Sequence, residues 1–304
     1  RESVLRLMKN RQSASDIAFD ILNYVIMAII LVTVVYPLIY IVSASFSDPA
    51  YVSGGEMWLW PVGVSLEGYQ RMLSYGEIWM GYANTVVYTI AGTLVALAVT
   101  LPSAYSLSRR DFVGGKILMI LVMITMFFSG GLIATYINIK NLGLLNTRLL
   151  MIINGACSAY NLIVSRTFFS SIPSELQEAA RIDGCSNFKL FFSIVLPVSK
   201  PIIAVMAMYY AVVHWNDYFT AMIYLKDRTL FPLQLFLREI LIQSQVSADL
   251  LADVEMAESI AAKARISSMI KYCSIVISTL PMLIAYPFFQ RFFVKGVMIG
   301  AIKG

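Results

Sequence analysis

Apolar residues fill long, nearly uninterrupted stretches of this chain, without the alternation of a half-buried strand or the single stripe of a soluble helix. A helix needs about 20 apolar residues to cross the hydrocarbon of a bilayer. Six stretches reach this length, and we expect a membrane-spanning helix in each: near residues 21–46, 82–107, 117–137, 149–168, 201–224 and 268–289.

The same pattern argues against a transmembrane barrel, whose strands would alternate over segments of about ten residues. The run from Leu22 to Val42 is instead continuously apolar, with isolated polar residues only. It is also too long for the apolar core of a signal peptide, so we expect it to remain as a helix. The chain is thus predicted to be an all-α integral membrane protein with six transmembrane helices, in a single domain of residues 1–304.

Composition and charge agree with a membrane protein. Hydrophobic residues make up 59% of the chain and charged residues 13%, with a mean hydropathy of +0.73, whereas soluble domains contain about 25% charged residues. Fourteen of the 23 Lys and Arg residues lie in segments on the side of the N-terminus, so both termini are expected to be cytoplasmic. The net charge of +5 is therefore interpreted as an asymmetry across the membrane, and nucleic acid is not an expected partner.

A polar interruption separates the fourth and fifth expected spans. Residues Glu178 to Pro197 have the sequence EAARIDGCSNFKLFFSIVLP. Ser174, with a glutamine three residues later, predicts a capped helix start, and Gly184 predicts the end of that helix. Ser186 or the next residue, Asn187, can cap a second helix. We therefore expect a helix, a turn and a second helix on the cytoplasmic side.

Two interpretations of this hairpin follow from the residues. It can rest on lipid headgroups as an amphipathic element, or it can lie in a groove of a soluble partner protein. The carboxylates of Glu178 and Asp183 favour the partner, because the cytoplasmic leaflet is itself anionic.

The combination of Glu178-Ala179-Ala180, Gly184 and the ending Ile194-Val195-Leu196-Pro197 resembles the EAA loop of ABC importer permeases. We call residues 169–200 the EAA loop. The resemblance implies the fold of a type I ABC importer permease, in which this cytoplasmic loop is the coupling helix that meets the ATPase. It assigns ATPase coupling to five residues: Glu178, Ala179, Ala180, Asp183 and Gly184.

The resemblance extends over nearly the whole chain. The ending from Gln290 to Gly304 is similar to the tail of MalG-type sugar permeases, where it reaches toward the ATPase dimer, and Trp215-Asn216-Asp217-Tyr218 also matches that group. Further segments resemble the branch that includes LplC and the alginate importer's permeases, which is associated with complex or acidic oligosaccharides: Tyr36–Leu38, Ser43–Asp48, Leu59–Pro61, Phe127–Gly131 and Ala211–Asp217.

This resemblance implies a permease subunit of an ATP-driven ABC importer that carries oligosaccharides across the bacterial cytoplasmic (inner) membrane. The expected cargo is alginate or another uronate oligosaccharide, and the alternative is a neutral or other complex oligosaccharide. The implied partners are a second homologous permease subunit, an ABC ATPase dimer, an extracytoplasmic solute-binding protein and membrane lipid.

Sites for chemistry are not expected in this chain. Gly114-Gly115-Lys116 is followed by Ile117 and lacks the leading glycine and the Ser or Thr of a Walker A loop. Three cysteines without paired spacing and a single histidine do not suggest a zinc site. We therefore expect no catalytic residue, no metal and no cofactor bound by this chain, with ATP and Mg used by the partner ATPase subunits.

Two rival functions remain to be compared. An ion-coupled secondary sugar carrier would need ionisable side chains inside the spans, where His214 and Asp217 are the main candidates. An intramembrane enzyme would need an acid pair, a Ser-Lys dyad or a metal cluster at helical spacing, and the spans contain none of these patterns.

Candidates for a substrate path come from the polar and aromatic residues within the expected spans. Sugars bind to aromatic faces and planar hydrogen-bonding groups, which suits Tyr210, Trp215, Asn216 and Asn161. The competing explanation is that such residues join neighbouring helices by hydrogen bonds.

Two external segments, residues 47–79 and the extracytoplasmic loop 225–267, are too long for simple turns. The resemblance implies that they receive the solute-binding protein. Four basic residues at the outer mouth would attract an anionic sugar, and an acidic cluster in the same loop opposes this. The bases are Lys226, Arg228, Arg238 and Lys271, and the acids are Asp249, Asp253, Glu255 and Glu258.

Overall fold

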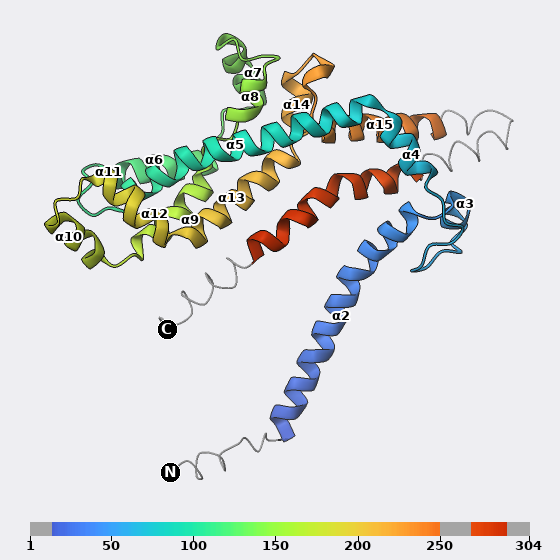
Figure 1. The fold of residues 1–304 in the computed structure, drawn as a ribbon, viewed down its shortest axis with the longest axis horizontal. Helices are drawn as coiled ribbons and strands as arrows, with labels where there is room; N and C mark the ends of the chain where they lie inside the picture. Colours follow the sequence, from blue (N-terminus) through green and yellow to red (C-terminus); the bar gives the residue numbers. More distant parts are fainter. Residues whose placement is uncertain (1–13, 250–268, 291–304) are drawn as a thin grey trace. The chain divides into compact units, whose positions relative to one another are not determined.

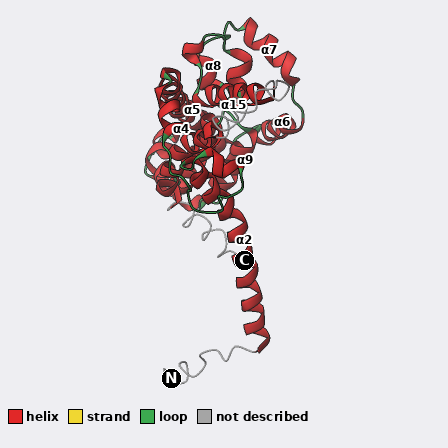
Figure 2. Ribbon diagram, turned by 90° about the vertical axis from the view of Figure 1, so that its right-hand side faces the viewer, coloured by secondary structure: helices red, strands yellow, loops and turns green. Residues whose placement is uncertain are grey.

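The computed structural model of the chain describes residues 14–249 and 269–290. Within these ranges every regular element is helical and no strand occurs (Figure 2), so the prediction of an all-α protein is confirmed. The chain divides into two compact units, which are described separately. Unit 1 comprises residues 1–71 and 244–276, and unit 2 comprises residues 72–243 and 277–304. The assignment of the chain to one permease domain stays a prediction.

Unit 1 is built around α2 (Ala14–Ser45), a 32-residue helix with apolar side chains exposed on all sides. A helix that is hydrophobic all round is typical of a membrane span. The chain then forms the short helix α3 (Pro49–Ser53), which Asp48 caps by accepting from the Ala50 amide at 2.8 Å. The following loop returns to α2, where the Ser43 hydroxyl donates to the Leu59 carbonyl at 2.5 Å.

Unit 2 is organised along α5 (Gly76–Ser108), which continues for 33 residues after α4 (Glu67–Ser74). Helices α13 (Lys200–Trp215) and α9 (Ala159–Ser170) pack along it (Figure 1). The approach of α5 and α13 is close at Gly92, where an added Cβ would lie 2.5 Å from His214 Nε2. A side chain at position 92 would overlap the buried imidazole of His214. Glycine at this position therefore allows the two helices to pack closely.

Several predicted spans are broken in unit 2. Helices α6 (Gly115–Phe127) and α7 (Gly131–Asn141) replace the single span expected at 117–137 and are bent by 115°. Gly131 has φ +75°, a conformation that glycine adopts without strain. The stretch at 149–168 forms α8 (Arg148–Ile153) and α9, and the stretch at 201–224 forms α13 and α14 (Phe219–Tyr224).

Asn146 joins the segment before α8 to the end of α14. Its amide donates to the Tyr224 carbonyl at 2.9 Å, and its side-chain Oδ1 accepts from the amides of Lys226 and Asp227, each at 2.9 Å. Asn146 adopts φ +56°, which asparagine tolerates better than most residues. The rings of Tyr136 and Tyr224 stack beside it at 5.9 Å. Helices α7, α8 and α14 are thereby connected.

The start of the segment after α14 is fixed onto α5. Asn84 donates to the carbonyls of residues 229 and 231 at 2.8 and 3.0 Å, and Tyr88 donates to the carbonyl of residue 230 at 2.8 Å. The Leu233 amide donates to the Thr85 hydroxyl at 2.8 Å. These bonds satisfy backbone groups of the turn η2 (Arg228–Leu230) and of the start of α15 (Leu233–Asp249). The base of the long loop 225–267 is thus part of the rigid frame of unit 2.

Among the residues that the structure describes, three helices are long and apolar enough to cross a membrane: Ser15–Ser45, Gly76–Ser108 and Met269–Gln290. Two bent pairs, α6 with α7 and residues Asn187–Val198 with α13, raise the number to five if each pair counts as one span. These lengths support a multi-pass membrane protein.

Candidate coupling site

The EAA loop forms a hairpin of short helices at one end of unit 2. It contains α10 (Ser174–Ile182), α11 (Asn187–Leu190), a π turn over Phe191–Val195 and α12 (Leu196–Val198). Pro173 occupies the N-cap position of α10 and no side chain caps this end. The predicted cap at Ser174 is therefore wrong, because Ser174 is already the first helical residue.

The turn between the two halves of the hairpin depends on Gly184. This glycine has φ +70°, its amide donates to the Arg181 carbonyl at 3.0 Å, and the Cys185 amide donates to the Ala180 carbonyl at 2.9 Å. Such bonds to the last carbonyls, with glycine in the left-handed conformation, end a helix sharply. Ser186 then caps α11 by accepting from the Lys189 amide at 3.3 Å, which confirms the predicted cap.

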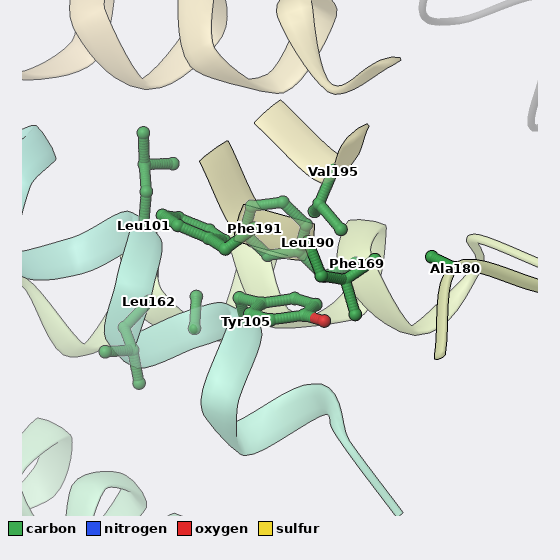
Figure 3. Close-up of a cluster of buried hydrophobic side chains, with 9 residues drawn as sticks. Leu101, Tyr105, Leu162, Phe169, Ala180, Leu190, Phe191 and Val195 are labelled. Atoms are coloured by element: carbon green, nitrogen blue, oxygen red, sulfur yellow. The ribbon is translucent and has the colours of Figure 1, made fainter. Parts of the chain in front are cut away.

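The inner side of the hairpin is packed into the core of unit 2 (Figure 3). The Phe191 ring stacks on Tyr105 at 5.1 Å, and Tyr105 also meets Phe169 edge-on at 5.9 Å. The buried cluster draws on α5, α9 and the EAA loop: Leu101, Ala104 and Tyr105, then Leu162 and Phe169, then Ala180, Leu190, Phe191 and Val195.

Burial of these side chains holds the hairpin in place. Each fully buried Leu, Val or Phe contributes ~1.5–3 kcal/mol relative to an exposed one. Leu190, Phe191 and Val195 are all buried, so their combined contribution exceeds what exposed ion pairs can supply, at ~0.2–1 kcal/mol each. This packing attaches the hairpin to the ends of α5 and α9.

A polar contact, which sequence reasoning missed, orients the hairpin. Asp111, in the loop between α5 and α6, accepts from Arg109 through two bonds of 2.9 and 2.6 Å and from Arg181 of α10 at 2.6 Å. Arg109 also donates to the Asn187 side chain at 2.7 Å. We call these four residues the Asp111 clasp. It ties both helices of the hairpin to the end of α5.

The Asp111 clasp keeps its charge over the physiological range. Hydrogen bonds from Arg109 and then Arg181 hold the pKa of the Asp111 carboxyl well below its usual range. The pKa of an aspartate carboxyl in the unfolded chain is about 3.9. When folding lowers this pKa, the ionised carboxylate stabilises the folded state at every pH above about 3.9. This stabilisation is lost as the pH falls toward the pKa of the folded state. The clasp is therefore insensitive to pH near neutrality.

The outer side of the hairpin is exposed. Glu178, Ala179, Asp183 and Gly184 all lie on the surface, and the Ile182 side chain is 86% exposed. Ala180, in contrast, is buried in the core cluster. The structure thus leaves four of the five predicted coupling residues exposed and buries the fifth. Their role in coupling stays a prediction.

The predicted path residues fall into two groups. Tyr210 is 2% exposed, and its hydroxyl bonds the Thr100 hydroxyl at 2.7 Å and accepts from the Ser158 amide at 3.3 Å. It thereby joins α13, α5 and the start of α9. Asn161 is also buried. These contacts match the explanation that polar residues join neighbouring helices.

Trp215 and Asn216 line a cavity of about 460 Å³ within unit 2. The cavity lies among α5, α13 and the later part of the helix Met269–Gln290, and most of its other lining residues are apolar. Trp215 Nε1 donates to the Ser278 carbonyl at 2.8 Å, which fixes the indole against that helix. Two of the four candidates, Trp215 and Asn216, therefore share one cavity.

The basic residues predicted for the outer mouth are less available for an anion than the sequence suggested. Arg228 forms two bonds of 2.8 and 2.9 Å with Glu77 and an ion pair of 3.1 Å with Glu239. Arg238 lies over the Tyr218 ring at 5.3 Å. Of the acidic cluster, residues 253, 255 and 258 lie outside the described ranges.

The described residues contain no group of three or more His, Cys, Asp or Glu side chains that could hold a metal ion. Cys157 is exposed, Cys185 is half-buried and Cys273 is buried, and all three are free thiols.

Comparisons with known proteins agree with this arrangement. Residues 78–299 match the family described as binding-protein-dependent transport system inner membrane component. The polygalacturonan/rhamnogalacturonan transport system permease protein YtcP of Bacillus subtilis (strain 168) is 40% identical, covering 98% of this chain and all of the relative. The protein LplC of the same organism is 37% identical, covering 94% of this chain and 95% of the relative.

A solved structure is also similar. The crystal structure of a bacterial ABC transporter involved in the import of the acidic polysaccharide alginate contains a chain that is 34% identical. The similarity covers 94% of this chain and all of that chain, with a TM-score of 0.81. The resemblance inferred from the EAA loop and the MalG-type segments is confirmed. This chain belongs to the family of binding-protein-dependent transport system inner membrane components.

Proposed function

We propose that this chain is one of two homologous permease subunits of an ATP-driven importer of oligosaccharides. The observation that carries the proposal is the EAA loop, whose inner side is fixed in the core of unit 2 and whose outer side is open. A hairpin held in this way transmits force from a bound protein to α5 and α9. The family and its sugar-transporting relatives support the same function.

The partner at the hairpin is an ABC ATPase dimer. The exposed side presents the carboxylates of Glu178 and Asp183, the small Ala179 and the apolar Ile182. A groove with a basic rim and an apolar floor would complement these groups. ATP and Mg belong to the ATPase, and this chain binds no cofactor. An extracytoplasmic solute-binding protein delivers the sugar to the opposite side.

Six spans cross the membrane, with both termini and the EAA loop in the cytoplasm. The three long helices, α6 with α7, and α13 account for five of them, and α8 with α9 supplies the sixth. A reporter enzyme fused after Gly304 or within residues 109–116 is expected to behave as cytoplasmic, and one near residue 250 as external. A cytoplasmic reporter at residue 250 would contradict the six-span arrangement.

The cargo is a uronate-containing oligosaccharide. This proposal rests on two similar proteins, one of which transports polygalacturonan and rhamnogalacturonan, while the other takes part in the import of the acidic polysaccharide alginate. Trp215 and Asn216 are the candidates for contact with the sugar, because they line a cavity, whereas Tyr210 and Asn161 support the helices around it.

Stimulation of ATP hydrolysis tests the cargo. The complete complex, reconstituted in lipid with its ATPase and binding protein, is expected to hydrolyse ATP faster with oligouronates than with neutral oligosaccharides. Stimulation by neutral sugars alone would contradict the uronate assignment and leave the permease assignment standing. Uptake driven by an ion gradient without the ATPase would instead favour a secondary carrier.

A further inference from the structure

A basic cavity lies at the end of α5 next to the start of α6. It has a volume of about 550 Å³, and four cationic side chains line it: Arg109, Arg110, Lys116 and Arg166. Among the residues that the structure describes, no carboxylate lines this cavity. Four like charges around one hollow repel each other, so the arrangement favours an anion between them.

The four charges are unequally neutralised. Arg109 is bonded to Asp111, as described for the clasp. Arg166 uses its Nε to donate to the Leu107 carbonyl at 3.1 Å, which also satisfies a group at the end of α5. Arg110 and Lys116 form no ion pair with any residue of the described ranges. The cavity therefore retains a net positive charge.

The backbone adds to this charge. Gly114 is the N-cap of the 13-residue helix α6, has φ +84° and leaves the helix without a side-chain cap. The start of a helix carries a partial positive charge. The amides of Gly115 and Ile117 already donate to the carbonyls of Phe112 and Gly114, so this end of α6 contributes its dipole. Because Gly114 and Gly115 both line the cavity, this end of α6 acts together with the four side chains.

Exposed apolar residues border the same cavity. Phe112 and Ile117 line the cavity and are exposed, and Val113, next to Phe112 in the chain, is 94% exposed. The outer surface of α6 continues this apolar strip with Ile120 and Leu121. A ligand that suits both parts has an anionic head for the cavity and hydrocarbon chains for α6. A free inorganic anion would use the head position alone.

We infer that this cavity binds the phosphate headgroup of an anionic phospholipid, with the acyl chains along α6. Basic pockets between membrane helices are suited to such headgroups. The inference rests on the membrane placement of the proposed function and does not depend on the cargo. It also connects lipid to the EAA loop, because Arg109 belongs both to this cavity and to the Asp111 clasp.

Native mass spectrometry of the purified complex in detergent tests the site. The unmodified complex is expected to retain phosphatidylglycerol in preference to the zwitterionic phosphatidylethanolamine. The double substitution Arg110→Gln with Lys116→Gln is expected to weaken retention of phosphatidylglycerol by about fivefold for each cation removed. Lys116→Arg keeps the charge and is expected to retain the lipid.

The control is Lys189→Gln, which removes an exposed cation of the EAA loop outside the cavity. It is expected to leave lipid retention unchanged. Equal loss with Lys189→Gln, or unchanged retention in the double variant, would overturn the site. Displacement of the lipid by inorganic phosphate, with the phosphate itself retained, would overturn the assignment to lipid. None of these measurements requires transport, so they are independent of whether the proposed import occurs.

Discussion

Replacing Gly184 by valine is expected to abolish most of the coupling between ATP hydrolysis and import. Gly184 has φ +70°, and a residue with a Cβ atom loses ~1–2 kcal/mol in the left-handed conformation, with a further penalty for a β-branched side chain. A loss of this size lowers the population of the native turn about 5- to 30-fold. The EAA loop would then present its outer side in the wrong orientation.

The measurement is sugar uptake and ATP hydrolysis by the reconstituted complex. The matched control is Gly184→Asn, because asparagine tolerates the left-handed conformation and nothing lies within 4 Å of an added Cβ. This variant should keep most of its coupling. Normal import by the valine variant, with the ATPase still bound, would show that the turn is not part of the coupling element.

Reversing the charge of Asp111 is expected to lower import strongly while leaving the protein folded. Asp111→Arg places three guanidinium groups together and releases Arg181 from the end of α5. It also removes the carboxylate that holds Arg109, the donor to the Asn187 side chain. The exposed ion pairs contribute only ~0.2–1 kcal/mol each to stability. The apolar cluster around Phe191 therefore keeps the EAA loop attached but no longer fixes the direction of α10.

A variant that exchanges the charges of residues 111 and 181 distinguishes a changed orientation of α10 from a general loss of structure. Asp111→Arg combined with Arg181→Asp keeps one carboxylate among two guanidinium groups and is expected to recover much of the import. Glu67→Arg breaks another exposed ion pair, the 2.6 Å contact with Arg71, and is expected to leave the amount of folded complex unchanged, as the single Asp111 variant should. Equal import by the single and double Asp111 variants would contradict a role for the clasp.

Local features of the EAA loop were predictable because each depends on residues adjacent in sequence. Gly184 ends α10 and Ser186 caps α11, as expected. The expected cap at Ser174 failed for an equally local reason: Pro173 already supplies an extended backbone before the first helical residue. The long apolar runs likewise predicted helices, because a helix must have about 20 apolar residues to cross the hydrocarbon of a bilayer.

Contacts between distant residues could not be predicted in this way. Asp111 and Arg181 are separated by 70 positions and Glu77 and Arg228 by 151. A charge count therefore treated Arg228 as available to an anionic sugar, although two carboxylates meet it. Tyr210 was similarly considered for sugar contact because an aromatic hydroxyl within a span suits both roles, and only the geometry reveals its bonds to Thr100 and Ser158.

The break between α6 and α7 was only partly visible in the sequence. The mean hydropathy is averaged over a window of residues, and it stays high across residues 128–130. The helix axis nevertheless bends by 115° between α6 and α7 at these residues. Gly130 and Gly131 permit such a bend. They do not determine its angle, because glycine is compatible with many backbone conformations.

The π turn at Phe191–Val195 sets the rotational phase between the EAA loop and α13. Its closing bond runs from the Leu196 amide to the Phe191 carbonyl, one residue wider than an α-helical bond. Since each residue of a helix advances the side chains by about 100°, removing one residue here would rotate the preceding hairpin by that angle and turn Leu190 out of the core. The length of the loop is therefore fixed to the single residue.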